Sequence, residues 1–429
     1  HAQKPPTRLR TCYICRFLLV DPHPSYSSMC RPCGAFNYSG SALSFPNSLK
    51  LSGRTALVTG ARVNLGYVTC LRLLRCGATV LATSRYPNDA AVRYSREVDF
   101  EEWKGRLKVI GADFRSARDA FALVKATKEA LREMGVEKLD ILVNNAAQTL
   151  TDSVKKEERA VFKERQQTEE AKGTNVVFEV GGDATYQPRV RGGVVPLALS
   201  FYGEGEPRAV SNTEEGVPTV EDITLPDNVK DDGRTELQPY FKSSWVQTVS
   251  EIPYEDIVSA HAVNAFVPLI LFRELLPLMG TPLQPSSNDR HQTGDQSRHP
   301  AKGRKPLGYI INVSSREGIF EQTPDHSAKR GAHVHTNMTK AAVNMITQTE
   351  AASAWKTRGV AMNTVDPGYM SAAPEMDGMF GGIRPLDWED GAGRVLWPVA
   401  VGEVEGDAVW GRFLKHYGAV DVDSNLKRG

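Results

Sequence analysis

From about residue 52 onward, short apolar runs alternate with longer segments in which apolar residues recur every three or four positions. The runs have the length of buried strands, and the periodic segments have the pattern of amphipathic helices. Strands and helices that alternate in this way form a parallel sheet with helices on both faces, so the predicted fold class is α/β. We expect a seven-stranded frame, with helices at 65–76, 118–134, 341–354 and 387–396 and its clearest strands at 55–59, 79–83, 107–112, 139–143, 309–315 and 408–417.

Length and composition narrow the class of protein. A chain of 429 residues is expected to form one large domain with additions, or two domains. Apolar residues make up 41% and charged residues 24%, as in a soluble globular protein, and a net charge of +1 indicates no nucleic-acid or acidic-membrane partner. We find no run of eighteen apolar residues and no apolar signal core at the start. The expected location is cytoplasmic, with an organelle left open.

Four of the six cysteines form two CxxC pairs separated by fourteen residues. This spacing is typical of a zinc ribbon or knuckle, in which four thiolates surround one ion. A metal would supply much of the folding energy of a segment with so little apolar material. Two disulfides or a chance pairing are the alternatives, and His23 is an alternative ligand. The predicted zinc ligands are Cys12, Cys15, Cys30 and Cys33, whereas Cys70 and Cys76 are expected to pack inside the fold.

The segment around these cysteines, residues 1–50, contains six Lys or Arg against one Asp and is rich in Pro and Ser. We expect a small metal-stabilised module with a linker, followed by the α/β domain over 51–429. No basic stripe with interleaved aromatic residues is present, so contact with another protein is favoured over nucleic-acid binding.

The first predicted strand runs into a glycine-containing turn. The sequence RTALVTG at 54–60 is followed by ARVNLG at 61–66 and then by a predicted helix. A strand that turns on glycine into a helix presents backbone N–H groups and a helix N-terminus to a pyrophosphate. The pattern therefore predicts a dinucleotide-binding turn.

Further motifs follow in a fixed order along the chain. They are TG-x-x-x-NLG at 59–66, Asp113, NNAA at 144–147, Asn264, INVSS at 311–315, Lys340 and DPG at 366–368. In this order they resemble the motif set of the short-chain dehydrogenase/reductase family. The resemblance covers about 51–420, interrupted by two long insertions, and does not cover the cysteine module. It implies a Rossmann-type fold, a nicotinamide cofactor, a small-molecule carbonyl or hydroxyl substrate and a homo-oligomer.

The resemblance assigns a cofactor site. Gly60 and Gly66 match the first and last glycines of the phosphate turn, and Asn64 stands where the family usually has its middle glycine. Asparagine tolerates a left-handed backbone better than most residues. Asp113 matches the residue that binds the adenine amino group. The other residues implied to bind the cofactor are Arg62, Leu65, Arg85, Phe114, Asn144, Ala146, Lys340, Pro367, Gly368 and Ser371.

The residues after the second strand bear on the choice of cofactor. Ser84 stands where an NAD-preferring enzyme carries an acid for the ribose 2′-hydroxyl, and Arg85 follows directly. A missing carboxylate and a nearby guanidinium suit a 2′-phosphate, to which Arg62 can add a second positive charge. NADP(H) is therefore predicted over NAD(H), with a surface role for Arg85 as the alternative.

The resemblance also assigns catalytic positions. Ser315 matches the serine that orients the substrate carbonyl, with Ser314 as the fallback. Lys340 matches the lysine that binds the nicotinamide ribose and lowers the pKa of the acid. Asn264 matches the asparagine that anchors a water in the proton relay.

Thr336 stands where the family carries its tyrosine, four residues before Lys340. Tyrosine, with an unperturbed pKa of about 10, can be tuned downward by a lysine, whereas an aliphatic hydroxyl is far too weak an acid. Three interpretations stay open. A histidine, His335 or His333, replaces the phenol; the acid comes from an insertion or is not needed; or the chain binds nucleotide without turnover.

The expected function is an NADP(H)-dependent oxidoreductase with an altered proton relay. The alternative is a catalytically impaired nucleotide-binding module used for protein interaction or sensing. Against that alternative, Ser315, Asn264 and Lys340 all match catalytic positions of the family, which a pure scaffold would not need.

Two insertions interrupt the frame, at about 148–256 and 280–306. The first is too long for an unstructured loop, with a helix-like part at 155–172 and strand-like parts at 174–180 and 194–202. Its stretch 204–256 holds thirteen Asp or Glu against four Lys or Arg, which indicates an acidic docking surface or a solvated elaboration. The second has the composition of a surface linker. The segment after Ser371 is expected to form a substrate loop.

Overall fold

The computed structural model describes residues 10–179, 186–191, 242–283, 304–321, 329–370 and 384–420. One compact unit consists of His1–Arg191 and Ser243–Gly429. A second unit, Gly192–Lys242, lies almost wholly outside the described residues. The predicted strand at 194–202, most of the acidic stretch, most of the predicted linker and the predicted substrate loop also lie outside them.

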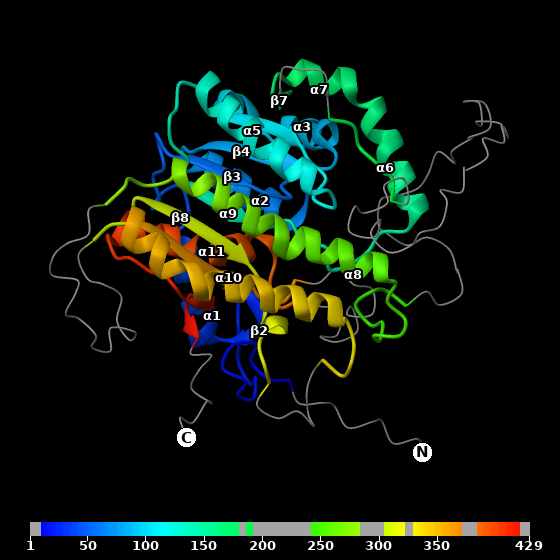
Figure 1. Ribbon diagram of the computed structural model, residues 1–429. Helices are drawn as coiled ribbons and strands as arrows, with labels where there is room; N and C mark the ends of the chain where they lie inside the picture. The colour runs from blue at the N-terminus through cyan, green and yellow to red at the C-terminus, as the bar shows by residue number, and fades with distance from the viewer. Residues whose placement is uncertain are drawn as a thin grey trace. The chain divides into compact units, whose positions relative to one another are not determined.

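The described unit is built around a nine-stranded sheet in the order β11-β10-β9-β8-β6-β3-β4-β5-β7 (Figure 1). All neighbouring strands are parallel except β10 and β11, which form an antiparallel hairpin. The predicted α/β class is therefore confirmed. The strands are β3 (Thr55–Val58), β4 (Thr79–Ser84), β5 (Leu107–Gly111), β6 (Ile141–Asn144), β7 (Val177–Phe178), β8 (Gly308–Val313), β9 (Val360–Asp366), β10 (Phe413–Lys415) and β11 (Gly418–Val420).

The seven strands of the predicted frame are present, and the sheet has two more, of which β7 lies within the strand-like part predicted at 174–180. β7 comes from the first insertion and pairs with β5 at the sheet edge. The segment predicted as one last strand, 408–417, enters the sheet only at Phe413 and then turns back through His416 and Tyr417. These two residues have φ of 50° and 59°, and two consecutive positive φ values suit the tight turn of a hairpin.

Alternate residues of the central strands enter two separate cores, as expected for a sheet covered on both faces. In β3, Ala56 and Val58 enter one core and Leu57 enters the other. The first core is covered by α2 (Asn64–Arg75), α3 (Pro87–Ser95) and α11 (Trp388–Ala400). The second is covered by α5 (Ala117–Glu133), α9 (Val267–Leu275) and α10 (Val334–Arg358) (Figure 1).

Shorter helices complete the described fold. In the first insertion, α6 and α7 confirm the helix-like prediction for 155–172, and α7 packs on α3. The remaining helical segments are α4 (Phe100–Trp103), η1 (Lys104–Arg106), α6 (Val154–Gln166), α7 (Thr168–Thr174), α8 (Tyr254–His261), η4 (Ala262–Phe266), η5 (Leu276–Leu278), η8 (Arg316–Gly318) and η11 (Val401–Glu405).

One long apolar helical run bears on membrane association. Among the described residues, Tyr254–Leu278 is long and apolar enough to cross a membrane by length and composition. The window that meets this criterion is 56% buried inside the fold, and Ile270, Leu271 and Leu275 belong to the second core. Buried core helices satisfy the same criterion, so the absence of a membrane span stays a prediction.

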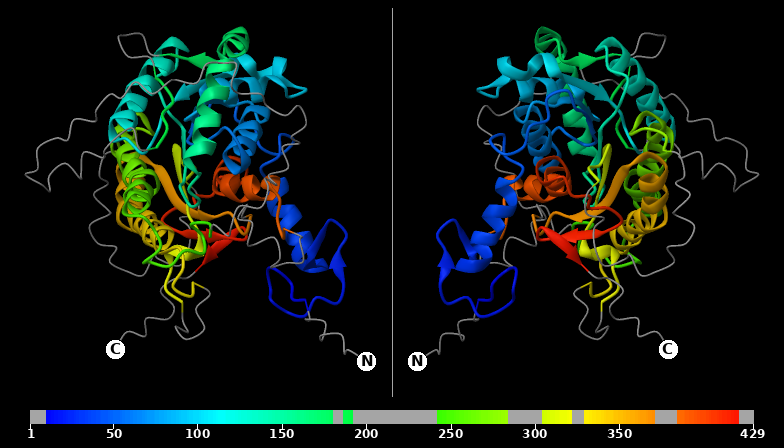
Figure 2. Two further views of the ribbon diagram at one scale, coloured as in Figure 1. Left: turned by 90° about the vertical axis from the view of Figure 1, so that its right-hand side faces the viewer. Right: turned by 90° about the vertical axis from the view of Figure 1, so that its left-hand side faces the viewer.

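A small module precedes the sheet, and we call residues 10–43 the cysteine module. It contains the hairpin β1 (Pro22–His23) and β2 (Tyr26–Cys30), followed by α1 (Arg31–Ala42). Helix α1 packs against α11 (Figure 2). Cys12, Tyr13 and Met29 belong to the first core of the sheet domain. The module is therefore continuous with the packing of that domain.

Candidate functional site

The turn between β3 and α2 has the backbone geometry that the sequence predicts. Gly60 has a φ of 66°, and a Cβ there would lie 2.8 Å from Cα of Ala146. A Cβ on Gly66 would meet the carbonyl oxygen of Gly60. Asn64 has a φ of 55°, so it adopts the left-handed conformation that usually favours glycine. Asparagine is therefore compatible with the turn.

Helix α2 begins at Asn64, after the N-cap Val63, and no side chain caps its N-terminus. Both residues line an adjacent pocket. Uncapped N–H groups and the positive end of the helix dipole suit an anion such as a pyrophosphate.

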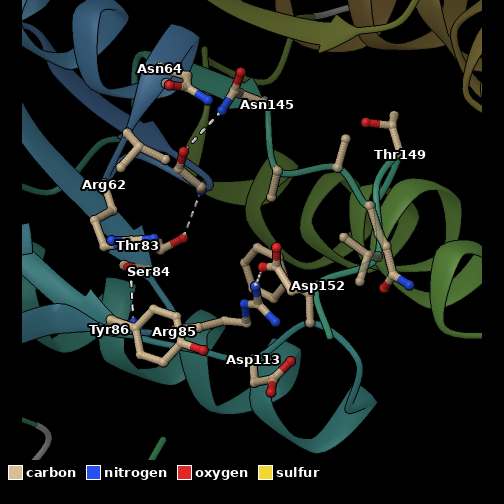
Figure 3. A pocket seen from close by; sticks show the side chains of 18 of the residues that line it. Arg62, Asn64, Thr83, Ser84, Arg85, Tyr86, Asp113, Asn145, Thr149 and Asp152 are labelled. Atoms are coloured by element: carbon tan, nitrogen blue, oxygen red, sulfur yellow. Dashed lines mark hydrogen bonds and ion pairs between the residues drawn. The ribbon is translucent and has the colours of Figure 1, made fainter. Parts of the chain in front are cut away.

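A cavity of about 380 Å³ opens beside this turn (Figure 3). It lies at the carboxyl ends of β3, β4, β5 and β6, which is the edge where parallel sheets bind nucleotides. Residues of the glycine turn, the ends of β4 and β5 and the loop after β6 contribute to its wall. The predicted cofactor residues that line it are Gly60, Arg62, Asn64, Leu65, Gly66, Arg85, Asp113, Phe114 and Ala146.

Other predicted cofactor residues lie outside this pocket. Asn144 is buried, and its Nδ2 donates to Oδ1 of Asn312 at 2.8 Å, which links β6 to β8. The pocket is lined instead by Asn145, whose Nδ2 donates to the carbonyl oxygens of Thr59 (3.0 Å) and Gly60 (3.1 Å). The side chain of Lys340 contacts the end of β8, and Pro367 and Gly368 directly follow β9. Ser371 lies outside the described residues.

Two arginines and an aromatic ring form one side of the pocket (Figure 3). Arg85 is about one-third exposed, and its Nη2 lies 3.6 Å from Oδ2 of Asp152. Arg62 donates to Asp89 at 2.5 Å. Their guanidinium groups lie 5.5 Å and 5.2 Å from the centroid of the Tyr86 ring. This side of the pocket therefore carries cations that already have acidic partners.

Glu157, from helix α6 of the first insertion, connects several of these groups and is 3% exposed. It accepts two bonds from Arg115 (3.0 and 2.9 Å), one from the backbone N–H of Arg191 (2.7 Å) and a longer one from Arg85 (3.4 Å). Arg115 also donates to Asp113 at 2.7 Å. Burial opposes ionisation of Asp113, but Arg115 outweighs it and holds the pKa of this carboxyl below its usual range. The wall is thus a buried ion-pair network.

Sequence reasoning missed several residues of this pocket. Arg115 was detectable as a basic neighbour of the predicted Asp113. Glu157 and Arg191 belong to the first insertion, and Trp388 begins the distant helix α11, so no motif connected them with the glycine turn. The missed lining residues with side-chain chemistry include Tyr86, Arg115, Asp152, Glu157, Arg191 and Trp388.

The two serines after β8 differ in their surroundings. Ser314 is 3% exposed, and its hydroxyl donates to the carbonyl oxygen of Lys340 at 3.4 Å. Ser315 is half-buried, and its Oγ accepts the backbone N–H of Glu317 at 3.3 Å. Within the described part of the chain, the hydroxyl hydrogen of Ser315 is not committed to another group. This geometry favours Ser315 over Ser314 as a donor to a substrate.

Lys340 and Asn264 lie behind this strand end. Lys340 is 5% exposed, and its Nζ donates to the carbonyl oxygen of Val313 at 2.9 Å. Desolvation lowers the pKa of Lys340 to about 8. Asn264 lies in the π-helical segment η4, and its Nδ2 donates to Oγ1 of Thr339 and to the carbonyl oxygen of Gln148, both at 3.0 Å. Such π-turns often occur at functional positions.

Thr336 and His335 are both enclosed by the fold. Thr336 is 1% exposed, and its Oγ1 has no hydrogen-bond partner among the described residues. His335 is fully buried, and neither ring nitrogen has a partner in the same part of the chain. Burial lowers the pKa of His335, and Asp256 acts in the opposite direction. Nothing in these surroundings makes Thr336 a stronger acid.

His333 has defined polar contacts. It is the N-cap of α10, with a φ of 43°, and its ring stacks on Trp245 with 4.3 Å between centroids. Nδ1 lies 2.7 Å from the carbonyl oxygen of Trp245, and Nε2 lies 3.2 Å from Oε2 of Glu317. Since Glu317 also donates its N–H to Ser315, His333 is connected to that serine through one residue.

The four predicted metal ligands come together in the cysteine module. The Sγ atoms of Cys12, Cys15, Cys30 and Cys33 all lie within 4.8 Å of one another, and none of these cysteines forms a disulfide. Four sulfurs at about 2.3 Å from a tetrahedral zinc would be about 3.8 Å apart, and Cys15 and Cys30 have that Sγ–Sγ distance, 3.8 Å. The donor set therefore fits zinc.

Among the four clustered cysteines, the electrostatic surroundings favour the thiolate at Cys12, whereas burial raises the pKa of Cys33. Burial opposes ionisation of Cys12, but the backbone N–H groups of Cys30, Cys15 and Ile14 lower its pKa to about 6. Nδ1 of His23 instead accepts the N–H of Ser25 at 3.2 Å, so His23 is not one of the clustered groups.

Comparison with known proteins agrees with this geometry. Residues 54–176 match the family model of the short chain dehydrogenases. This segment runs from β3 almost to β7 and includes the glycine turn and most of the pocket wall. It belongs to the short-chain dehydrogenase family, so the resemblance inferred from the motifs is confirmed there.

Over a longer span, the chain is 27% identical across 416 residues to the uncharacterized protein R665 of Acanthamoeba polyphaga mimivirus, which covers 92% of this chain and 72% of that protein. Among solved structures, it is similar to the promiscuous reductase LugOII, which catalyses keto-reduction at C1 during lugdunomycin biosynthesis (20% identity, TM-score 0.47, 86% of this chain and 96% of that chain). It is also similar to the angucycline C-6 ketoreductase LanV with bound NADP (19% identity, TM-score 0.48, 86% and 95%).

Proposed function

We propose that this chain is an NADP(H)-dependent oxidoreductase that acts on a carbonyl or hydroxyl compound with an altered proton relay. The observation that carries the proposal is the left-handed turn at Gly60 and Asn64 beside an open pocket, with Ser315 and Lys340 at the end of β8. Dinucleotides bind across the carboxyl ends of such a sheet. The residues of the pocket would hold the adenosine half, and residues at the ends of β6, β8 and β9 would hold the nicotinamide half.

The surroundings of the second strand support NADP(H). Ser84 offers no carboxylate to a ribose 2′-hydroxyl, and its Oγ accepts the N–H of Tyr86 at 2.9 Å. The contacts of Arg85 with its acidic partners, at 3.4 and 3.6 Å, are longer than the roughly 2.7–2.9 Å of strong charge-assisted hydrogen bonds. A 2′-phosphate would offer a shorter contact to Arg85, and Arg62 lies over the same Tyr86 ring as a second positive charge.

The chain's own residues would orient the reacting groups. When bound, the reduced cofactor supplies a hydride to the carbonyl carbon, and the oxygen takes up a proton to give the alcohol. Ser315 donates its free hydroxyl hydrogen to the carbonyl oxygen and fixes its direction. Lys340, whose Nζ donates to the carbonyl oxygen of Val313 at the same strand end, would donate its other N–H groups to the ribose hydroxyl groups.

We assign the altered relay to His333 and Glu317. An imidazole carries a proton in the neutral range, which Thr336 cannot do. Glu317 donates its backbone N–H to Ser315, and its carboxylate contacts Nε2 of His333, so the residue that pairs with the imidazole is anchored at the serine that orients the substrate. His333 is favoured over His335 because it contacts Glu317, whereas His335 interacts with Asp256 and with the backbone of Thr149.

The second candidate function is nucleotide binding without turnover. The observation in its favour is that the hydroxyl of Thr336 is buried and that Lys340 is bonded to a backbone carbonyl. Under this alternative the turn and the pocket retain affinity for the dinucleotide, and the cysteine module or the acidic insertion contacts a protein partner.

Titration with NADPH and NADH, followed by hydride transfer to a panel of carbonyl compounds, tests the proposal. We expect the wild-type chain to bind NADPH more tightly and to oxidise it with at least one carbonyl. Arg85→Asp should weaken NADPH binding at least tenfold and NADH binding little, while the exposed control Arg118→Asp changes neither.

His333→Gln should lower kcat by roughly a hundredfold or more while NADPH affinity is retained, because a general acid contributes about 10²–10⁴ to the rate. If kcat fell on replacing His335 but not on replacing His333, His335 would be the proton donor instead. NADPH binding without turnover across the panel would support the binding module in place of the oxidoreductase.

A further inference from the structure

The cysteine module contacts two segments that border the pocket and the ends of the catalytic strands. The first contact is made by Tyr13, which lies between the clustered Cys12 and Cys15 and is 5% exposed. Its hydroxyl accepts the backbone N–H of Tyr369 at 2.7 Å. A Cβ on the neighbouring Gly368, which has a φ of 98°, would lie 3.0 Å from the same hydroxyl oxygen.

The loop that Tyr13 holds is connected to the end of β8. Asp366, the last residue of β9, accepts the N–H of Gly368 at 2.8 Å through Oδ1. Through Oδ2 it accepts the N–H of Arg316 at 3.1 Å, and Arg316 directly follows Ser315. The hydroxyl of Tyr13 is therefore linked to the strand end that carries Ser315 by three backbone N–H groups, those of Tyr369, Gly368 and Arg316, and by the carboxylate of Asp366.

The second contact is made at the first turn of α11. Asp390 is 4% exposed, and its Oδ1 accepts bonds from the hydroxyl of Tyr26 and from Nδ2 of Asn37, both at 2.9 Å. Two residues earlier on the same turn, Trp388 lines the nucleotide pocket. The hydroxyl of Ser28 also donates to the carbonyl oxygen of Pro385 at 3.0 Å, just before α11 begins.

The first of these contacts reaches the loop after β9, and the second reaches the first turn of α11. We propose that the cysteine module is a positioning element for the nicotinamide-side wall of the site, with Tyr13 as the positioning residue. The inference rests on the proposed function for the identity of the cofactor. The position of Tyr13 is fixed by its clustered neighbours, since Cys12 accepts the N–H of Cys30 across the module at 3.4 Å.

The test compares two ligands that share only the adenosine half of the cofactor. NADPH reaches both halves of the site, whereas adenosine 2′,5′-bisphosphate occupies only the pocket over β3–β5. Tyr13→Phe removes the hydroxyl that accepts the Tyr369 N–H and keeps the ring in the core. The matched control is Tyr38→Phe in α1, because Tyr38 is exposed.

Tyr13→Phe is expected to weaken NADPH binding about tenfold and to leave the affinity for adenosine 2′,5′-bisphosphate within twofold of wild type. The fluorescence emission of bound NADPH should shift toward that of the free cofactor, and the metal content should stay unchanged. Tyr38→Phe should behave as wild type for both ligands.

An equal loss of affinity for both ligands in Tyr13→Phe would overturn the inference, because it would indicate general destabilisation. Unchanged binding of both would overturn it as well. A wild-type chain that bound neither ligand would overturn the proposed cofactor itself, and that result is distinguishable because it precedes any substitution.

Discussion

At the scale of single residues, the buried position of Lys340 destabilises its ammonium group. Its side chain is enclosed at the end of β8, where the only polar contact of Nζ in the described chain is the carbonyl oxygen of Val313. Desolvation disfavours the ammonium and lowers the pKa of Lys340 to about 8, against roughly 10.4 for a solvated lysine. Buried groups that are expensive to maintain are often functional, which agrees with the role proposed for Lys340.

The cost gives a pH-dependent prediction. Below about pH 8 both the folded and the unfolded chain are protonated at Lys340, so the penalty is fully present; between about pH 8 and 10.4 the unfolded chain binds more protons, and stability rises. At pH 7 the Lys340→Met variant should therefore have a higher free energy of unfolding than the wild type. By pH 10 this difference should be smaller by roughly 2–3 kcal/mol. Urea unfolding at both pH values measures the difference. The exposed control Lys356→Met should show no such change.

At the scale of elements, the sequence predicts what periodicity and local motifs determine. The central strands and α2, α5, α10 and α11 follow from alternation and helical spacing, and the left-handed Asn64 follows from its place in the turn. The hairpin at His416 was not predicted, because neither turn residue is a glycine that would mark a positive φ. The ion-pair network was not predicted either, since it joins α6 to β5 and β4 across separations that no local pattern records.

Helix α6 is joined to the pocket wall chiefly through Glu157. This buried carboxylate accepts hydrogen bonds from the side chain of Arg115 and from the backbone N–H of Arg191. Its removal would leave the positive charge of Arg115 with one fewer acidic partner. Glu157→Ala should lower the free energy of unfolding by roughly 3 kcal/mol, as expected for one partner of a buried ion pair. Chemical denaturation measures this loss. Glu158→Ala, on the exposed side of the same helix, should cost less than about 0.5 kcal/mol.

At the scale of the whole molecule, the described fold combines a short-chain dehydrogenase segment with a cysteine module that shares its core. We propose that the four clustered thiolates hold one structural zinc ion. Formation of a homo-oligomer, docking of a protein partner on the module or on the acidic insertion, and a cytoplasmic location stay predictions.

Metal analysis of the purified chain tests the zinc proposal. The wild type should contain about one zinc per chain, and Cys12→Ser should lose it and unfold at a lower temperature, because metal binding contributes directly to folding. Cys70→Ala, which alters a buried cysteine of α2 outside the cluster, should keep its zinc. A wild-type chain without stoichiometric metal would contradict the proposal.

A buried contact between Arg394 of α11 and Asn37 of the cysteine module bears on how the two parts of the chain evolve. The side chain of Arg394 is 2% exposed, lies over the ring of Tyr417 and donates to Oδ1 of Asn37 at 2.5 Å. A dehydrogenase cut at residue 50 would keep this buried cation and lose its amide partner. The cysteine module and the catalytic domain therefore depend on each other for this buried contact. Substitutions at Asn37 and Arg394 are expected to be inherited as a pair, so the module and the catalytic domain should diverge together.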